Sequence, residues 1–342
     1  ETALSYEFIP KLIPYREAQQ KRIASCIAPM FNHQTGRNVV VFGPPGVGKT
    51  VATKHILNEL EEKTTEIIPF YINCWQKNTS YKIMLAICDL LDYKFTHNKK
   101  TDELFDIIAN RINKLSNVFV FDEIDKVEDT DFLYLILQKV QNKSIILLTN
   151  YKEYVSQIDM RIRSRLTPEM LEFRPYNFDE TKGILKERIE FAFEEKVWSA
   201  RAFEMIAKRT FELHDIRTGL YLLKEAGYIA EEKSARLVDT ESSQAALAKL
   251  DDFKVNSTAQ LPDDNQFILD LIKENSPSKI GDLYKIYEQR VKSPASYKTF
   301  TRKIQKLDDG KYISVKKTEG GAQGNTSIIS YSTQNKTLDD FS

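Results

Sequence analysis

A glycine-rich loop between an apolar run and a helical pattern most constrains what this chain of 342 residues can fold into. Val39–Phe42 is a short apolar run, and the segment GPPGVGKT follows it directly from Gly43 to Thr50. An apolar run bounded by glycine and proline is typical of a buried strand, and helical spacing continues after the loop towards Leu60. Strand, G-x-x-x-x-G-K-T loop and helix in this order predict a phosphate-binding loop.

The residue types in this loop explain how it would hold a nucleotide. Glycines let backbone N–H groups turn towards phosphate oxygens, and the helix N-terminus adds partial positive charge. Lys49 can reach the β- and γ-phosphates of ATP or ADP, and the Thr50 hydroxyl can coordinate Mg²⁺. The residues expected to bind the nucleotide here are Gly46, Val47, Gly48, Lys49, Thr50 and Val51.

A second motif is the segment VFVFDEID over Val118–Asp125. Its apolar half predicts a central strand, which places Asp122 and Glu123 at the carboxyl end, where parallel sheets bind ligands. Asp122 can hold Mg²⁺, and Glu123 can orient and deprotonate the attacking water. Acids often follow strands without any catalytic role, but together with the phosphate-binding loop they favour hydrolysis.

A third strand is predicted over Ser144–Asn150, with the polar Asn150 at its end. The amide of Asn150 could reach the γ-phosphate or the attacking water. The alternative is an ordinary residue of a turn.

A cluster of arginines follows within Asp159–Leu166, whose sequence is DMRIRSRL. Arg163 and Arg165 could serve the γ-phosphate of a neighbouring subunit as an arginine finger. The alternative is the basic face of a solvated helix, and the residues alone do not decide between the two.

The composition excludes some partners. The formal net charge is zero, so a nucleic-acid surface must be a local patch. No apolar run approaches the length of a membrane span, and the N-terminus lacks a signal-peptide pattern, so no membrane partner is expected. Cys26, Cys74 and Cys88 lack metal-ligand spacing and are interpreted as free thiols of a cytoplasmic protein.

The first part of the chain alternates strands with helices, which predicts an α/β core with a parallel sheet over residues 1–175. The further elements expected there are a helix at Arg16–Phe31, a strand at Glu66–Cys74, helices at Ser80–Leu91 and Thr101–Leu115, and an edge strand at Glu169–Phe173.

After Pro175 the strand pattern stops, and residues 176–252 predict a separate, all-helical domain. Its helices are expected at 178–193, 199–212, 214–233 and near 241–250. Asp215 and Arg217 lie near the start of the third helix. Arg217 could fold over the nucleotide as the domain closes, although such an arginine is more often a surface ion-pair residue.

Residues 253–342 predict a linker and a small third domain. The polar stretch 251–262 is typical of a linker. Three helices and two alternating strands around the glycine-rich loop Gly320–Gly324 then follow the plan of a winged helix-turn-helix. These elements are expected at Gln266–Glu274, Lys279–Val291, Ser293–Leu307, Tyr312–Lys317 and Ser327–Tyr331, and the polar residues after Asn335 are expected to be disordered.

The third helix of this domain carries a basic face opposite its apolar one. Its predicted DNA contacts, with two lysines of the following strand, are Lys298, Thr299, Arg302, Lys303, Lys306, Lys316 and Lys317. In a helix-turn-helix this helix enters the major groove of double-stranded DNA, and lysines of the wing can contact phosphates. The alternative is a solvated basic face on a protein-interaction domain.

Taken in order, these segments resemble the archaeal DNA replication initiators of the origin-recognition and Cdc type, a family of AAA+ ATPases. The resemblance covers nearly the whole chain. Besides GPPGVGKT and VFVFDEID, it is carried by FIPKLIPYRE from Phe8, LLTN before Tyr151, RIRSRL from Arg161, RPYNFDETKGILKER from Arg174 and HDIRTGLYLLKEAG from His214. It implies an AAA+ core, a helical lid and a C-terminal winged helix.

The resemblance also implies roles for individual residues. The family places a tyrosine and an arginine of the core-to-lid hinge at the nucleotide, which fall on Tyr176 and Arg188. Its arginine finger falls first on Arg165 and second on Arg163, and its second sensor falls on Arg217. The family also uses an extra helix on DNA, at the place of Ser80–Leu91. This makes Lys82 a candidate DNA contact, with Lys77 just before the helix.

The function expected from residues and resemblance together is an ATP-regulated DNA-binding switch. The nucleotide base is expected near Tyr15 and Arg16. The protein would recognise origin DNA and help to load the replicative helicase, with slow ATP hydrolysis, and would be cytoplasmic and associated with the nucleoid. Two alternatives are an assembly ATPase, such as a clamp-loader or helicase-loader subunit, and a transcription regulator that merely binds nucleotide. The DNA sequence recognised, the oligomeric state and the recruited replication protein do not follow from the sequence.

Overall fold

The computed structural model describes residues 2–5, 8–10, 13–259, 263–291, 294–309, 312–318 and 326–331. The chain forms two compact units, Glu1–Leu247 and Ala248–Ser342. The first unit contains both the sheet and the helices that follow it, so the expected three-domain division stays a prediction.

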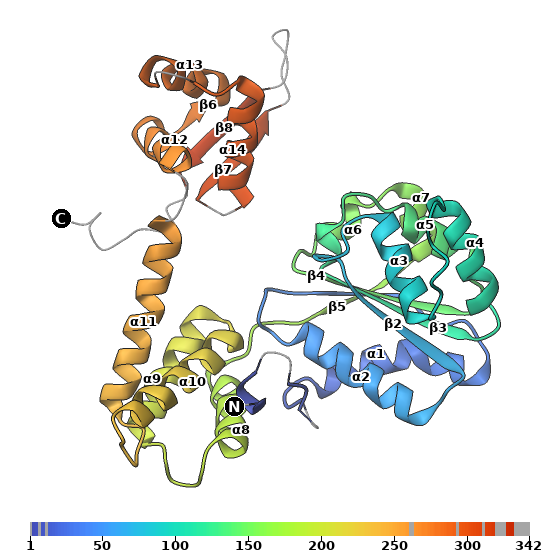
Figure 1. Ribbon diagram of the computed structural model, residues 1–342, viewed down its shortest axis with the longest axis horizontal. Helices are drawn as coiled ribbons and strands as arrows, with labels where there is room; N and C mark the ends of the chain where they lie inside the picture. Colours follow the sequence, from blue (N-terminus) through green and yellow to red (C-terminus); the bar gives the residue numbers. More distant parts are fainter. Residues whose placement is uncertain are drawn as a thin grey trace. The chain divides into compact units, whose positions relative to one another are not determined.

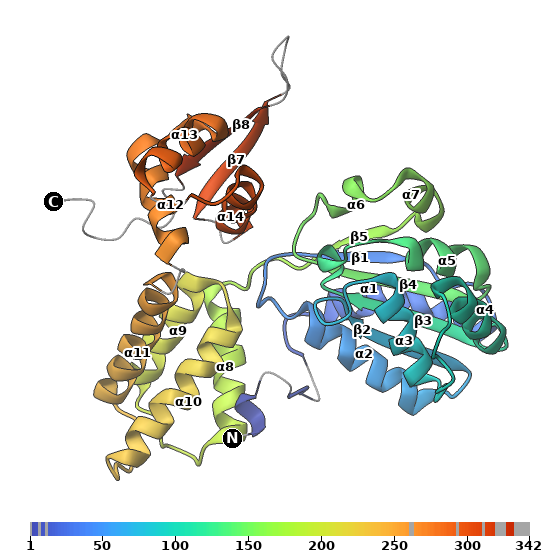
Figure 2. The same ribbon diagram turned by 45° about the horizontal axis from the view of Figure 1, so that its top comes forward.

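The first unit is built on a five-stranded parallel sheet with the strand order β2-β3-β4-β1-β5 (Figures 1 and 2). The strands are β1 (Val39–Phe42), β2 (Ile67–Asn73), β3 (Ser116–Asp122), β4 (Lys143–Thr149) and β5 (Glu169–Glu172). All five were predicted, and β5 lies at the edge as expected. Because every pair is parallel, the carboxyl ends of β1, β3 and β4 meet at one edge of the sheet.

Helices cover both faces of this sheet, which explains why the central strands are apolar along their whole length. Val118 and Val120 of β3 pack into a core that contains residues of α1 (Glu17–Ile27) and α2 (Lys49–Lys63). Successive side chains of a strand point to opposite faces. Phe119 and Phe121 therefore belong to the other core, together with the helices α3 (Ser80–Leu90), α4 (Thr101–Ile112), α5 (Asp131–Lys139) and α7 (Met160–Leu166).

Some elements of the first unit differ from the expectation. The predicted helix at 16–31 is α1 followed by a 3₁₀ turn, η2 (Ala28–Asn32), and Pro29 lies at the start of that turn. Helix α5 was not predicted, because its short, strongly apolar sequence does not distinguish a helix from a buried strand. The single-turn helix α6 (Tyr154–Gln157) was also missed.

The helical lid contains α8 (Phe178–Ala192), α9 (Ala200–Leu213), α10 (Ile216–Glu232) and α11 (Thr240–Ala259). The fourth helix was expected near 241–250, but α11 continues to Ala259 through the first part of the predicted linker, whose role as a linker stays a prediction. The segment contains no glycine or proline, so nothing in it stops a helix despite its polar composition.

The second unit has the element order expected of a winged helix-turn-helix domain. It contains α12 (Asp263–Asn275), β6 (Ser278–Lys279), α13 (Ile280–Arg290), α14 (Tyr297–Asp309), β7 (Ile313–Thr318) and β8 (Thr326–Tyr331). The strands form an antiparallel sheet in the order β6-β8-β7. Leu283, Tyr287 and Phe300 lie in its core.

Two details of this unit correct the expectation. Helix α14 begins at Tyr297, later than the predicted Ser293, because Pro294 precedes it and Ser296 accepts hydrogen bonds from the first turn. Strand β6 was not predicted, since two residues carry no periodic signal. The loop Gly320–Gly324 and the residues after Asn335 lie outside the described residues.

Among the described residues, the structure contains no helix with both the length and the apolar character needed to cross a membrane.

Close packing within the lid makes Gly219 a test of this arrangement. A Cβ atom at Gly219 of α10 would lie 2.6 Å from Thr210 Oγ1 and 2.8 Å from Leu185 Cδ2. We therefore expect Gly219→Ala to lower the free energy of unfolding by about 1–3 kcal/mol, even though alanine favours helices. Urea unfolding followed by circular dichroism measures this change.

The matched control is Gly281→Ala in α13, where nothing lies within 4 Å of the added Cβ. This variant should be neutral or slightly more stable. A Gly219→Ala protein as stable as the control would show that the lid helices do not pack as described.

Candidate nucleotide site

The phosphate-binding loop connects β1 to α2 at the edge of the sheet where the parallel strands end. Strand β4 lies beside β1, and β3 lies beside β4, so Asp122 and Asn150 end at the same edge as the loop. Gly46 and Gly48 have φ angles of 77° and 90°. Glycine adopts this left-handed region without the steric cost that a side chain brings. The predicted order of strand, glycine-rich loop and helix is confirmed.

Lys49 places a buried ammonium group in the loop. Its Nζ donates to the carbonyl oxygens of Gly43 (2.7 Å) and Pro44 (2.8 Å) and to Asn150 Oδ1 (2.9 Å). The side chain is 8% exposed, and within the described ranges no carboxylate lies within ion-pair distance of Nζ. Burial is the main cause that lowers the pKa of Lys49 to about 8. The site therefore holds a desolvated cation that an anionic phosphate would compensate.

Asp122 and Thr50 form the donor pair expected for a metal ion. Thr50 Oγ1 donates to Asp122 Oδ2 at 2.7 Å, and Tyr71 Oη donates to the same oxygen at 2.6 Å. The Glu123 N–H donates to Asp122 Oδ1 at 2.9 Å. The described residues contain no group of three or more histidine, cysteine or acidic side chains that could hold a metal alone. One carboxylate and one hydroxyl instead fit Mg²⁺ that takes its other ligands from phosphates and water.

Glu123 lies directly after β3 in a left-handed conformation with φ 55°. A non-glycine residue in this region is strained, and such strain is found at functional sites. Burial raises the pKa of Glu123, and the nearby carboxylates of Asp122 and Asp125 raise it further. A raised carboxyl pKa suits a group that takes a proton from water.

Two residues, Asp215 of the lid and Tyr176 just before it, lie against the phosphate-binding loop. A Cβ at Gly46 would lie 2.1 Å from Asp215 Oδ1, and a Cβ at Gly48 would lie 2.8 Å from Tyr176 Oη. Both loop glycines are therefore needed for this approach. Asp215 caps α10 through the N–H of Arg217 (2.9 Å).

Arg217 lies in the first turn of α10, and its predicted role at the nucleotide stays a prediction. Its positive charge adds to the burial that lowers the pKa of Lys49, and it opposes the burial that raises the pKa of Glu123. The side chain itself is exposed. It can therefore turn towards a phosphate without breaking an existing ion pair within the described part of the chain.

The predicted nucleotide residue Arg188 has other contacts in the structure. It is 9% exposed, its Nη1 donates to the carbonyl of Ala3 (3.3 Å), and its guanidinium lies 4.9 Å from the ring centre of Phe8. Burial lowers the pKa of Arg188. The residue thus anchors the N-terminal segment on α8, and a role at the nucleotide stays a prediction.

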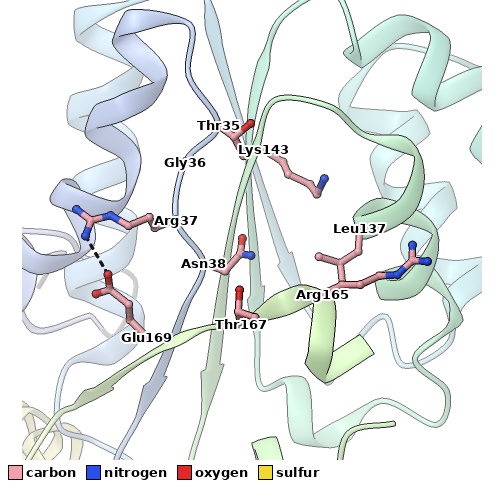
Figure 3. A pocket seen from close by; sticks show the side chains of 9 residues that line it. All are labelled: Thr35, Gly36, Arg37, Asn38, Leu137, Lys143, Arg165, Thr167 and Glu169. Atoms are coloured by element: carbon pink, nitrogen blue, oxygen red, sulfur yellow. Dashed lines mark hydrogen bonds and ion pairs between the residues drawn. The ribbon is translucent and has the colours of Figure 1, made fainter. Parts of the chain in front are cut away.

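Arg165 and Arg163 are both exposed on α7. Arg165 lines a pocket of about 480 Å³ with residues that precede β1 and begin β4 and β5 (Figure 3). On one side of the pocket Arg37 pairs with Glu169, and on the other side lie Lys143 and Arg165. This pocket lies where β1 begins, whereas the phosphate-binding loop of the same chain follows the end of β1. The four residues of the strand put roughly 13 Å between the two places.

The predicted DNA contacts lie mainly on α14. Lys298 and Arg302 are exposed, whereas Thr299 and Lys303 are half-buried. The side chains of Lys306, Lys316 and Lys317 lie outside the described residues. Lys82, on α3, is exposed and donates to Asn78 Oδ1 at 2.8 Å.

Two functional residues were not predicted in their observed roles. Tyr71 holds Asp122 through the hydrogen bond described above, because β2 and β3 are adjacent in the sheet. Arg16 is buried beneath the loop, where its Nε donates to the carbonyl of Val47 at 3.1 Å. Only the order of the strands, which no local pattern reveals, could have indicated the role of Tyr71.

Comparison with known families agrees with this geometry. Residues 32–153 match the AAA domain family, and residues 182–247 match the Cdc6 AAA+ ATPase-type lid domain family. The first match contains the loop, Asp122, Glu123 and Asn150, and the second contains Arg217. The chain is therefore a nucleotide-binding ATPase of the AAA+ class.

The relatives refine this class. The chain is 29% identical to ORC1-type DNA replication protein 1 of Sulfolobus acidocaldarius, over 95% of this chain and 87% of the relative. It is 28% identical to the ORC1-type DNA replication protein of Methanosphaera stadtmanae, over 95% and 90%. Over nearly its whole length the chain is thus similar to archaeal ORC1-type DNA replication proteins, the family that the sequence motifs resemble.

Solved structures show the same fold over nearly the whole chain. The structure of the Aeropyrum pernix ORC1 protein in complex with DNA superimposes with a TM-score of 0.77, 25% identity and coverage of 96% of this chain and 92% of that one. Cdc6p from Pyrobaculum aerophilum gives a TM-score of 0.67, with 18% identity and coverage of 97% and 93%.

The pKa of Lys49 predicts how nucleotide affinity depends on pH. Lys49 binds a phosphate as an ammonium ion, and a bound phosphate raises its pKa above the value of about 8 in the free protein. The affinity for ADP should therefore be full below pH 8 and fall as the pH rises through 8. We expect the Kd, measured by calorimetry without Mg²⁺, to rise about tenfold from pH 7.5 to 9.5. A Kd that stays constant over this range would contradict the assignment of Lys49.

Proposed function

We propose that this chain is an ATP-dependent DNA-binding replication initiator, which recognises double-stranded origin DNA and helps to load the replicative helicase. The observation that carries the proposal is that one chain holds a loop of the phosphate-binding type, with Asp122 and Asn150 beside it, and a separate basic helix, α14. The relatives named DNA replication proteins, and the DNA-bound Aeropyrum pernix ORC1 structure, support the same function.

The proposed nucleotide is ATP or ADP with Mg²⁺. The backbone of Gly46–Gly48 and the ammonium of Lys49 would hold the phosphates, with Thr50 and Val51 in the first turn of α2. Thr50 and Asp122 would hold Mg²⁺, which neutralises charge on the phosphates when bound. Tyr71 keeps the Asp122 carboxylate in place. Tyr176, Arg188 and Arg217 are the proposed nucleotide contacts of the hinge and lid.

The proposed hydrolysis is slow and uses residues at the ends of β3 and β4. Glu123 would deprotonate the attacking water, since its raised pKa makes it a better base than an ordinary carboxylate. The Asn150 amide oxygen accepts a hydrogen bond from the Lys49 ammonium in the structure, and the amide would turn to the γ-phosphate or the water. Loss of the γ-phosphate would remove the contacts of Asn150 and Arg217, and the lid would then relax.

The arginine finger is proposed to act on a neighbouring subunit. Arg165, with Arg163 second, lies at the edge of the sheet away from its own loop, and both side chains are exposed. A finger supplied by another molecule contributes about 10³–10⁵ in rate. An isolated subunit should therefore turn over ATP slowly.

Mixing two inactive variants tests this arrangement. Arg165→Ala should retain ATP binding but lose most of its concentration-dependent turnover, and Lys49→Ala should lose nucleotide binding. In a mixture, Lys49→Ala subunits would supply Arg165 to intact nucleotide sites, so phosphate release should recover in part. The control is Arg161→Ala on the same helix, because Arg161 is already paired with Asp159 at 3.0 Å.

This control should behave like the wild type. If the mixture stays inactive, or if Arg165→Ala alone turns over ATP normally, then Arg165 is not the finger.

Double-stranded DNA is the proposed partner of α14 and of the extra helix α3. On α14, Phe300 and Ile304 are buried in the core, whereas Lys298 and Arg302 face solvent. A basic face opposite a buried face is what a recognition helix needs to enter the major groove. Thr299 and Lys303 on α14, Lys306, Lys316 and Lys317 in the second unit, and Lys82 on α3 complete the proposed contacts.

Two substitutions on α14 separate affinity from salt dependence. Arg302→Ala should weaken duplex binding by about 1–3 kcal/mol, and Lys306→Ala should reduce the slope of log K against log salt by about one. Fluorescence anisotropy at several salt concentrations measures both. Lys208→Ala, an exposed lysine on α9 of the lid, is the control and should change neither. Unchanged isotherms for both α14 variants would remove this helix from the DNA interface.

The alternatives considered from the sequence are less well supported. Clamp-loader subunits end in a helical collar, whereas the second unit ends in the antiparallel pair β7 and β8. A regulator that only binds nucleotide has no need for Glu123, the proposed base for the attacking water. Within the proposed function, the protein acts with other initiator subunits or the replicative helicase and is associated with the nucleoid in the cytoplasm.

A further inference from the structure

The guanidinium of Arg16 lies beneath the phosphate-binding loop and touches three parts of the first unit. Its Nε donates to the carbonyl of Val47 at 3.1 Å, and its Nη2 donates to the carbonyl of Arg174 at 2.6 Å. Its Cζ lies 3.9 Å from the ring centre of Tyr176 and 5.2 Å from that of Phe173. The residue is 1% exposed, so almost none of its surface is left to meet a ligand.

This burial revises the expectation that Arg16 lies at the nucleotide base. A buried arginine charge is costly unless it is well satisfied, and no described carboxylate lies within ion-pair distance of Arg16. Its partners are instead two main-chain carbonyls and two aromatic faces. A planar guanidinium can satisfy all of these at once, whereas the flexible ammonium of lysine cannot.

The contact with Val47 determines how the loop presents its backbone. The Val47–Gly48 peptide is planar and trans, so the Val47 carbonyl and the Gly48 N–H point in opposite directions. Arg16 holds the carbonyl on the buried side. The Gly48 N–H is thereby directed to the other side, which is where a phosphate-binding loop needs its donors.

The hydrogen bond to the Arg174 carbonyl also connects Arg16 to the hinge between sheet and lid. Arg174 lies between β5 and α8, and Tyr176, whose ring stacks on Arg16, lies against Gly48. One side chain therefore joins the loop peptide, the hinge carbonyl and the hinge tyrosine. A shift of the hinge would move the loop donors, and a phosphate that orders the loop would order the hinge.

We propose that Arg16 is a positioning residue, which fixes the phosphate-binding loop in its binding conformation and couples it to the hinge without touching the nucleotide. The inference rests on the proposed nucleotide site. It predicts that Arg16 supports the binding of any ligand with a β-phosphate, with or without a base.

The test compares Arg16→Lys with the wild type for three ligands, pyrophosphate, ADP and ATP, by calorimetry. Loss of the two hydrogen bonds to the Val47 and Arg174 carbonyls should weaken the binding of all three ligands by a similar factor, about tenfold. In turnover assays KM should rise by the same factor while kcat stays within about twofold, because Glu123 and Asp122 are unchanged. At saturating ADP, hydrogen exchange of the hinge peptide 170–180 should stay faster in the variant than in the wild type.

Two further variants control this test. Arg174→Ala removes an exposed side chain but keeps the carbonyl that Arg16 contacts, so it should bind all three ligands like the wild type. Tyr176→Leu removes the stacked ring and the hydroxyl beside Gly48 and serves if Arg16→Lys does not fold. A uniform loss that includes pyrophosphate supports the positioning role, whereas a loss confined to ADP and ATP reports only the proposed contact of Tyr176 with the nucleotide and contradicts that role.

The possible outcomes separate the proposals. If Arg16→Lys weakens ADP and ATP but not pyrophosphate, Arg16 contacts the base and the positioning role is wrong. If folded Arg16→Lys binds all three ligands normally, the positioning role is also wrong. A wild-type protein that binds none of them would instead overturn the nucleotide site itself.

Discussion

A buried ammonium group that donates hydrogen bonds to neutral groups is the feature on which the nucleotide site depends. Lys49 is held by two loop carbonyls and the Asn150 amide, without a carboxylate partner among the described residues. Burial is the main cause that lowers its pKa to about 8, so the charged form is less favourable in the free protein than it is in water. A phosphate anion would reverse this penalty, because a desolvated cation gains most from a charge brought into the same environment.

The rest of the first unit places groups around that cation. The parallel order of β3, β4 and β1 brings Asp122, Asn150 and the loop to one edge. Thr50 and Tyr71 fix the Asp122 carboxylate, and the helix α10 of the lid begins against Gly46. The lid therefore contacts the loop itself, which is the contact on which the proposed link between nucleotide binding and lid position rests. The opposite edge carries Arg165, the residue proposed to act on a neighbouring subunit.

Much of this arrangement could be predicted from the sequence, because the signals are local. The loop, the acidic end of β3 and the amide after β4 each follow an apolar strand, and a parallel sheet brings strand ends together. The lid helices and most elements of the second unit also follow from their periodicity. The end of the fourth helix, expected near residue 250, was wrong because polar composition alone does not distinguish a loop from a helix.

The remaining features depend on contacts between segments that are distant in sequence. Tyr71 reaches Asp122 only because β2 pairs with β3, and Arg16 reaches Val47 and Arg174 across the fold. The buried setting of Arg188 beside Ala3 and Phe8 could not be seen in a helical pattern either. Local patterns thus indicate which residues carry chemistry, whereas the fold determines which residues hold them in place.

The most direct measurement of the central claim is calorimetric binding of a non-hydrolysable ATP analogue to the wild type and to Lys49→Met. Methionine keeps much of the length and packing of lysine but removes the cation. We predict one bound nucleotide per wild-type chain and a loss of at least about a hundredfold in affinity for Lys49→Met, as expected when a desolvated charge partner is removed. Equal affinity in the two proteins would show that the nucleotide does not bind at this loop and would contradict the account.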